Sequence, residues 1–99
     1  MAYTLAVSET QTLERERTLD QILPPYAVIL LNDDVHSMDF VVAALIKSIP
    51  QLTLERAAEV MLEAHNHGQA TVLVCPLEQA ELYRDRLQSF GLGALIERC

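Results

Sequence analysis

A short acidic segment holds the side chains best suited to chemistry. Asn32, Asp33 and Asp34 are consecutive, and the stretch NDDVHSMD at residues 32–39 carries three carboxylates and no Lys or Arg. Carboxylate and carboxamide oxygens accept hydrogen bonds, so this segment suits a ligand with a positive group. The same residues are also typical of turns and helix caps, because Asn and Asp side chains bond their own backbone.

A histidine and a methionine accompany this segment from further along the chain. Met61 and His65 are one helical turn apart on a predicted helix, where they share a face that can pack beside the acidic segment. Met38 and Met61 would then form adaptable apolar walls. Histidine and methionine at helical spacing are also common in an ordinary core, and that interpretation stays open.

Metal binding and catalysis are weaker interpretations of the same groups. A metal site would draw on Asp33, Asp34, His36, His65 and His67. The sequence contains no HExxH or CxxC motif, and His65 and His67 lie about 200° apart around a helix. We therefore expect no metal and no cofactor. We also expect no catalytic residue, because Cys75 falls in an apolar run and Ser37 suits a helix cap.

Composition narrows the class of protein. The chain has 99 residues, 51% of them hydrophobic, which fits one domain. Fourteen acidic and seven basic side chains give a formal charge of −7, which disfavours nucleic-acid binding. The sequence shows no apolar run of about 20 residues and no signal-peptide pattern, and its two cysteines suit a reducing compartment. We therefore expect a protein of a reducing compartment such as the cytoplasm that does not contact membranes.

Six elements are predicted after a polar start. Residues 1–22 have no sustained periodicity of apolar residues, so they are expected to be a flexible extension with a helical turn near 12–17. A folded core is expected at 23–99. Apolar runs at 26–31, 70–75 and 94–98 predict strands, the first of them central. Helices are predicted between Ser37 and Pro50, between Thr53 and Gly68, and from Pro76 to Gly91. The helix after Ser37 is expected to be mostly buried, and His65 is expected on an apolar stripe.

This order, β-α-α-β-α-β, predicts an α+β fold in which a mostly antiparallel sheet of three strands packs against three helices. The chain also resembles the ClpS family, small adaptors that deliver N-degron substrates to AAA+ Clp proteases. The resemblance rests on the run PPYAVILLNDDVHSMDFVVAALIKSIPQLTLERAAEVMLEAHNHGQATVLVC and covers residues 24–83. It combines a Pro-flanked strand, an Asn-Asp-Asp loop, a Met that opens a helix and a Glu-Arg-Ala helix ending near His. Its details lean toward the cyanobacterial and plastid branch.

The resemblance implies a non-enzymatic adaptor. A substrate's N-terminal Leu, Phe, Tyr or Trp would enter a small pocket while its α-amino group is held at the rim. By position, the residues that hold the amino group are Asn32, Asp33, Asp34 and His65. The implied lining of the hydrophobic pocket is Leu30, His36, Met38, Val41, Met61 and Ala64.

Two departures from the family pattern bear on specificity. His36 and Ser37 stand where many members have Thr-Pro, which puts an imidazole at the pocket edge. Ala64 stands where a larger aliphatic residue is common, which would enlarge the pocket and favour aromatic N-termini.

The partners implied by the resemblance are N-degron proteins and the N-domain of a ClpA- or ClpC-type AAA+ unfoldase, and we expect a monomer. The alternative function is a small protein–protein interaction module without an N-degron pocket, similar to the C-terminal domain of the ribosomal stalk protein. In that case the Asn-Asp-Asp loop would only cap a helix.

Overall fold

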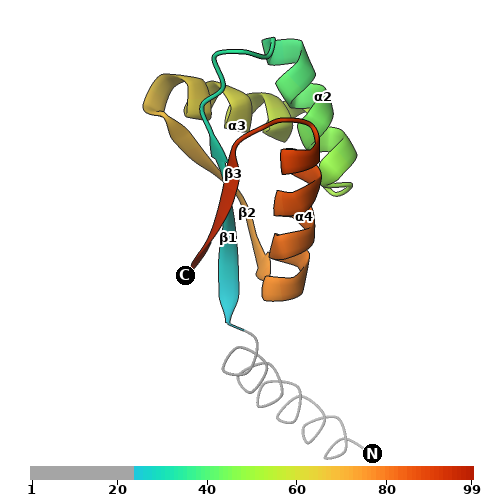
Figure 1. Ribbon diagram of the computed structural model, residues 1–99, viewed down its shortest axis with the longest axis vertical. Helices are drawn as coiled ribbons and strands as arrows, with labels where there is room; N and C mark the ends of the chain where they lie inside the picture. Colours follow the sequence, from blue (N-terminus) through green and yellow to red (C-terminus); the bar gives the residue numbers. More distant parts are fainter. Residues whose placement is uncertain (1–23) are drawn as a thin grey trace, which may run out of the picture.

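The structure is a computed structural model that describes residues 24–99. The expected extension at 1–22 and the helical turn near 12–17 lie outside the described residues. From Pro24 onward the order of elements is β-α-α-β-α-β, as the sequence predicts (Figure 1).

The sheet has three antiparallel strands, β1 (Pro25–Leu31), β2 (Gln69–Pro76) and β3 (Ala94–Arg98), in the order β2-β1-β3. The central place of β1 agrees with its continuous apolar sequence, and Val28, Ile29 and Leu30 are 0%, 4% and 1% exposed. Successive side chains of a strand point to opposite faces. Val28 and Leu30 accordingly join the main core cluster, which does not include Ile29.

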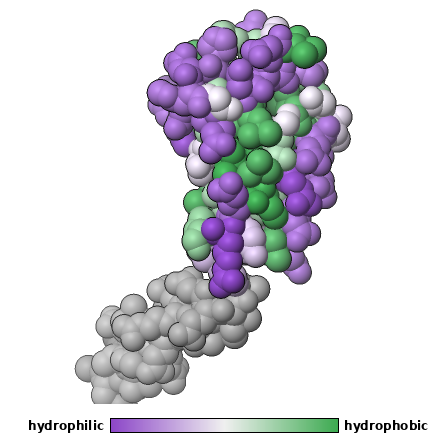
Figure 2. Space-filling model, turned by 60° about the vertical axis from the view of Figure 1, so that its left-hand side comes forward, coloured by the Kyte–Doolittle hydropathy of each residue, from purple (hydrophilic) through white to green (hydrophobic). Residues whose placement is uncertain are grey.

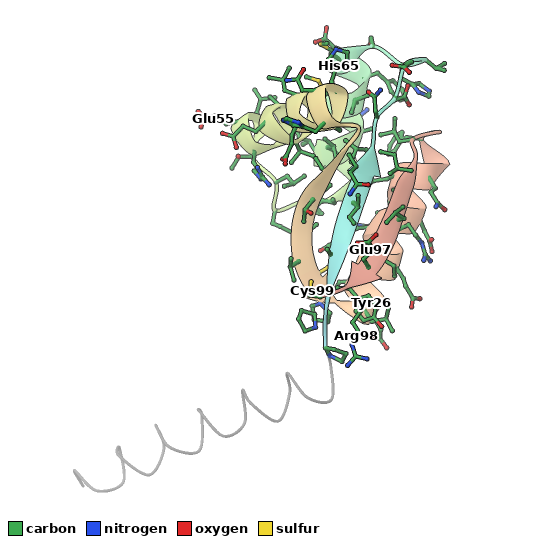
Figure 3. The ribbon with its side chains drawn as sticks, turned by 90° about the vertical axis from the view of Figure 1, so that its left-hand side faces the viewer. Tyr26, Glu55, His65, Glu97, Arg98 and Cys99 are labelled. Atoms are coloured by element: carbon green, nitrogen blue, oxygen red, sulfur yellow. The ribbon has the colours of Figure 1, made fainter. Side chains whose placement is uncertain are left out.

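The three helices are α2 (Met38–Ser48), α3 (Leu54–His67) and α4 (Leu77–Ser89). Helices α3 and α4 pack on the sheet, and α2 packs on these two helices. In Figure 3 the strands lie in front of α4, and α3 lies at the upper end of the sheet. A strip of apolar residues runs down this side between hydrophilic flanks (Figure 2). The core lies between the sheet and the helices. Its largest fully buried side chains are Leu30, Leu45, Ile49, Leu87, Val28, Val60 and Ser48.

The helix ends follow the predicted capping residues. The Ser37 hydroxyl accepts a hydrogen bond from the Phe40 N–H at 3.1 Å, and the Thr53 hydroxyl accepts one from the Arg56 N–H at 3.1 Å. Gly68 ends α3 with φ of 90°, a left-handed conformation that favours glycine. These caps fix where α2 begins and where α3 turns back into β2.

The expected burial of α2 is wrong in part, and so is the apolar stripe of α3. Phe40 is 38% exposed, while Leu54 and Leu62 are 66% and 47% exposed. Helix α2 packs mainly against α3 and α4 rather than on the sheet, and the outer seam between α2 and α3 stays open. Leu54 lies on this seam, whereas Phe40 packs beside His36 and Phe90.

None of the helices found in residues 24–99 has the length and apolar character needed to cross a membrane.

Candidate functional site

The acidic segment forms the loop between β1 and α2, and backbone hydrogen bonds tie it to two other parts of the fold. The Leu31 N–H donates to the Gly93 carbonyl at 2.9 Å, just before β3. The Asn32 N–H donates to the Gly68 carbonyl at 2.9 Å, at the end of α3. The start of the loop is therefore fixed beside the C-terminal end of α3, which carries His65.

Asp33 is the internal acceptor of this loop. Its Oδ1 accepts from the N–H groups of Val35 and His36 at 2.8 and 2.7 Å, and its Oδ2 lies 2.7 Å from His36 Nδ1. The hydrogen bond from the His36 backbone N–H is the main cause that lowers the pKa of Asp33; burial opposes it, and the imidazole contributes in the same direction as that N–H. Both oxygens are thus engaged within the loop, so Asp33 orders the loop and its histidine.

His36 is held from two further directions. Its ring stacks on Phe40, with centroids 4.6 Å apart and planes 15° from parallel. On the loop after α4, Gly91 has φ of +85°, and a Cβ added there would lie 3.3 Å from His36 Cε1. Glycine at this distant position therefore suits the left-handed backbone and leaves room for the imidazole, against which a Cβ would be tightly packed.

Asn32 and Asp34 form a second pair. The Asn32 Nδ2 donates to Asp34 Oδ1 at 3.1 Å, and both residues are exposed. Because the amide nitrogen is engaged by Asp34, the carbonyl oxygen of Asn32 remains an acceptor for a ligand. The negative charge of Asp34 lies beside that oxygen.

A pocket lies between this loop, the first turn of α2 and the last turns of α3. Its lining consists of Leu30, Leu31, Asn32, Asp33, His36, Met38, Val41, Met61, Ala64 and His65. Every predicted site residue except Asp34 therefore lines this pocket. Asp34 is connected to the pocket by its hydrogen bond with Asn32. Leu31 also lines the pocket, although it is not among the residues that the resemblance implies.

His65 differs from the expected position on an apolar stripe, because it is exposed and contributes to the lining of the pocket. It lies at the end of the molecule where β1 runs into the loop (Figure 3). His67 is also exposed and is not part of the pocket lining. Within residues 24–99, no three His, Cys, Asp or Glu side chains gather in a way that would hold a metal ion.

The pocket combines an apolar wall with a polar rim. Leu30, Val41 and Ala64 are buried at its floor, while Met38 is 47% exposed at its edge. The cavity volume is about 20 Å³, which is space for about one water. A larger side chain can enter only if the walls move, and methionine side chains adapt readily.

Comparison with known proteins decides the family. The model of the ATP-dependent Clp protease adaptor protein ClpS matches residues 21–94. The chain belongs to the ClpS family. It is an adaptor of the Clp protease and not an enzyme.

Relatives of this chain include ClpS adapters from cyanobacteria and a plastid, in agreement with the resemblance. The ClpS adapter of Gloeobacter violaceus is 43% identical over 88 residues, covering 89% of this chain and 95% of that protein. A chloroplastic ClpS adapter of Arabidopsis thaliana is 38% identical over 96 residues, covering 92% of this chain and 60% of that protein.

A solved ClpS structure shares the fold. Agrobacterium tumefaciens ClpS2 bound to L-phenylalaninamide has a TM-score of 0.72 and 29% identity, and the match covers 77% of this chain and 98% of that one. The fold predicted from the sequence is thus confirmed both by the structure and by this ClpS neighbour.

Proposed function

We propose that this ClpS family member binds proteins that begin with Leu, Phe, Tyr or Trp and delivers them to a Clp AAA+ unfoldase for degradation. The observation that carries the proposal is a small pocket in which an apolar wall meets the acceptor side chains of the loop and of His65. The L-phenylalaninamide bound by Agrobacterium ClpS2 supports it, since that ligand has an aromatic side chain and a free α-amino group.

The α-amino group would be held at the rim. An ammonium group offers three N–H donors and needs acceptors that converge on it. The Asn32 carbonyl oxygen and a ring nitrogen of His65 are the acceptors proposed to meet it directly. Asp34 supplies negative charge through its contact with Asn32, and Asp33 holds the loop in shape.

The first side chain of the substrate would enter between Met38, Met61 and the buried floor. Burial of a Leu- or Phe-sized side chain contributes about 1.5–3 kcal/mol, and each hydrogen bond to the charged group about 1.5–3 kcal/mol before ordering costs. Such a sum reaches micromolar affinity, about −8 kcal/mol. Neither half suffices alone, because an internal Leu lacks the amine and a polar N-terminus lacks the apolar group.

Delivery requires a second contact. We assign it to the N-domain of a ClpA- or ClpC-type unfoldase, with residues 1–22 as part of the connection. The bacterial ClpS relatives favour the bacterial cytosol as the compartment in which a monomer of this protein meets its substrates.

A panel of substrates tests the proposal. One folded reporter protein is prepared with Phe, Leu, Tyr, Trp, Gly or Asp as its first residue, and its degradation by a purified Clp unfoldase and protease is followed with and without this adaptor. Acceleration of the four bulky hydrophobic N-termini and not of Gly or Asp is expected. Equal rates across the panel would contradict the proposal.

A further inference from the structure

A second, more open cavity lies on the outer seam between α2 and α3. Its lining consists of Asp39, Val42, Ala43, Ile46, Leu54, Ala58 and Met61, and its volume is about 440 Å³. The α2 members recur at positions i, i+3, i+4 and i+7, and the α3 members at i, i+4 and i+7, so each helix contributes one continuous stripe. We call this cavity the α2–α3 groove.

The α2–α3 groove is mostly apolar and open to solvent. Leu54 is 66% exposed and Ala43 is also exposed, while Val42, Ile46 and Met61 are partly buried. Among its lining residues, Asp39 in the first turn of α2 carries the charged side chain. The groove therefore offers apolar contact and one carboxylate.

Met61 connects the groove with the pocket described above, because its side chain lines both cavities. Neighbouring residues of α2 divide in the same way. Met38 and Val41 line the pocket, while Asp39 and Val42 line the groove. The pocket and the groove are therefore neighbouring cavities that share Met61.

We propose that the α2–α3 groove binds the side chains of the second to fourth residues of a substrate whose first residue occupies the pocket. This inference rests on the proposed function. Met61 and Leu54 are seven positions apart on α3, which is about 10 Å along a helix. An extended peptide covers this distance in about three residues. The groove leads away from the end of α3 that bears His65 and toward the end that bears Glu55 (Figure 3).

The chemistry of the groove specifies the occupant. Leu, Ile or Met at positions two to four would bury apolar surface against Val42, Ile46 and Leu54. An Asp or Glu there would meet the Asp39 carboxylate, and like charges repel. The substrates favoured by this protein therefore have apolar or basic residues after the first one.

The test varies only those positions. Three peptides beginning Phe-Leu-Leu, Phe-Ser-Ser and Phe-Asp-Asp share the rest of their sequence, and L-phenylalaninamide reports the pocket alone. Calorimetric affinities of the full chain are expected to be about tenfold higher for Phe-Leu-Leu than for Phe-Ser-Ser, from partial burial of two side chains. Phe-Asp-Asp is expected to bind more weakly than both.

Two groove variants and one control complete the design. Ala43→Glu and Leu54→Glu change exposed groove residues, so the fold should tolerate them. Leu82→Glu changes a leucine on α4 that is 45% exposed and lies outside the groove. The ratio of the affinity for Phe-Leu-Leu to that for Phe-Ser-Ser should fall to about twofold or less in both groove variants and stay at about tenfold in the control. Affinity for L-phenylalaninamide should be unchanged in all three.

The outcomes separate the groove from the pocket. If the amide binds and the three peptides have equal affinities, or if both groove variants keep the full preference, the groove inference is wrong and the proposed function stands. Slower delivery to the unfoldase by the groove variants, with the peptide preference intact, would assign the groove to the unfoldase and also overturn the inference. If wild-type protein binds neither the amide nor the peptides, the proposed function fails and the groove inference with it.

Discussion

Asp33 Oδ2 lies 2.7 Å from His36 Nδ1, and this pair shapes the loop at the candidate site. Two backbone hydrogen bonds to Asp33 Oδ1 close the turn, so one carboxylate sets both the path of the loop and the orientation of the imidazole. Phe40 and Gly91 hold the other sides of the ring. The loop is consequently preorganised, which lowers the entropy lost when a ligand binds.

The lowered pKa of Asp33 predicts how this loop responds to acid. Its contribution to folding is fully present above the unfolded-state value of about 3.9 and is lost as pH falls through the lower folded-state pKa. Asp33→Asn should lower the unfolding free energy by about 1–3 kcal/mol at pH 7. In urea unfolding, the difference between wild type and variant should shrink below about pH 4. A difference that stays constant down to pH 2 would contradict this role of the carboxylate.

Gly91 and Gly68 form a matched pair for testing the contact with His36. Both have positive φ, so Ala at either position costs about 1–2 kcal/mol of backbone strain. Only at position 91 would the new methyl group meet a side chain, 3.3 Å from His36 Cε1. Gly91→Ala should therefore lower both thermal stability and affinity for a Phe-initial peptide. Gly68→Ala should lower stability alone, and equal loss of affinity in the two variants would argue against a specific effect through His36.

His65 and His67 allow a similar comparison on one helix. His65 lines the pocket, whereas His67 is exposed outside it. His65→Ala removes one proposed acceptor for the α-ammonium. The affinity for a Phe-initial peptide should therefore fall by between about tenfold and about a hundredfold. His67→Ala should leave the affinity unchanged. Equal affinities of His65→Ala and wild type, measured by fluorescence anisotropy, would remove His65 from the site.

Ala64 sets the depth of the pocket in this account. It is 2% exposed in the pocket lining, and Ala57 is equally buried on the same helix but outside the pocket. Ala64→Val should lower the affinity for Phe- and Trp-initial peptides by about tenfold, because overpacking costs about 1–3 kcal/mol. The affinity for Leu-initial peptides should fall less. Ala57→Val should destabilise the fold without changing the ratio of Phe to Leu affinity. A ratio unchanged by Ala64→Val would mean that Ala64 does not limit pocket size.

Much of the fold could be predicted because its signals are local. Ser37, Thr53 and Gly68 mark helix ends through their own backbone neighbours, and the apolar run of β1 indicates a central strand. The burial of α2 could not be predicted in the same way. It depends on α2 packing against α3 and α4 instead of the sheet, which periodicity alone does not specify.

The candidate site, like the fold, could be predicted only in part. The residues of the pocket could be assembled from the loop and its resemblance to the ClpS family. The separate roles of Asn32, Asp33 and Asp34 could not be predicted, because they depend on hydrogen-bond geometry within the turn. The contact between His36 and Gly91 was also missed, since no sequence pattern links a loop residue with a glycine 55 positions away.

Binding of a Phe-initial peptide, compared with the same peptide acetylated at its N-terminus, tests the central claim most directly. Acetylation leaves the side chain unchanged and removes the charge, so affinity should fall by about a hundredfold. The affinity of the free peptide should also decline as pH rises past about 7.7–8.0, where an α-amino group loses its proton. Equal affinity for the free and acetylated peptides would contradict the account.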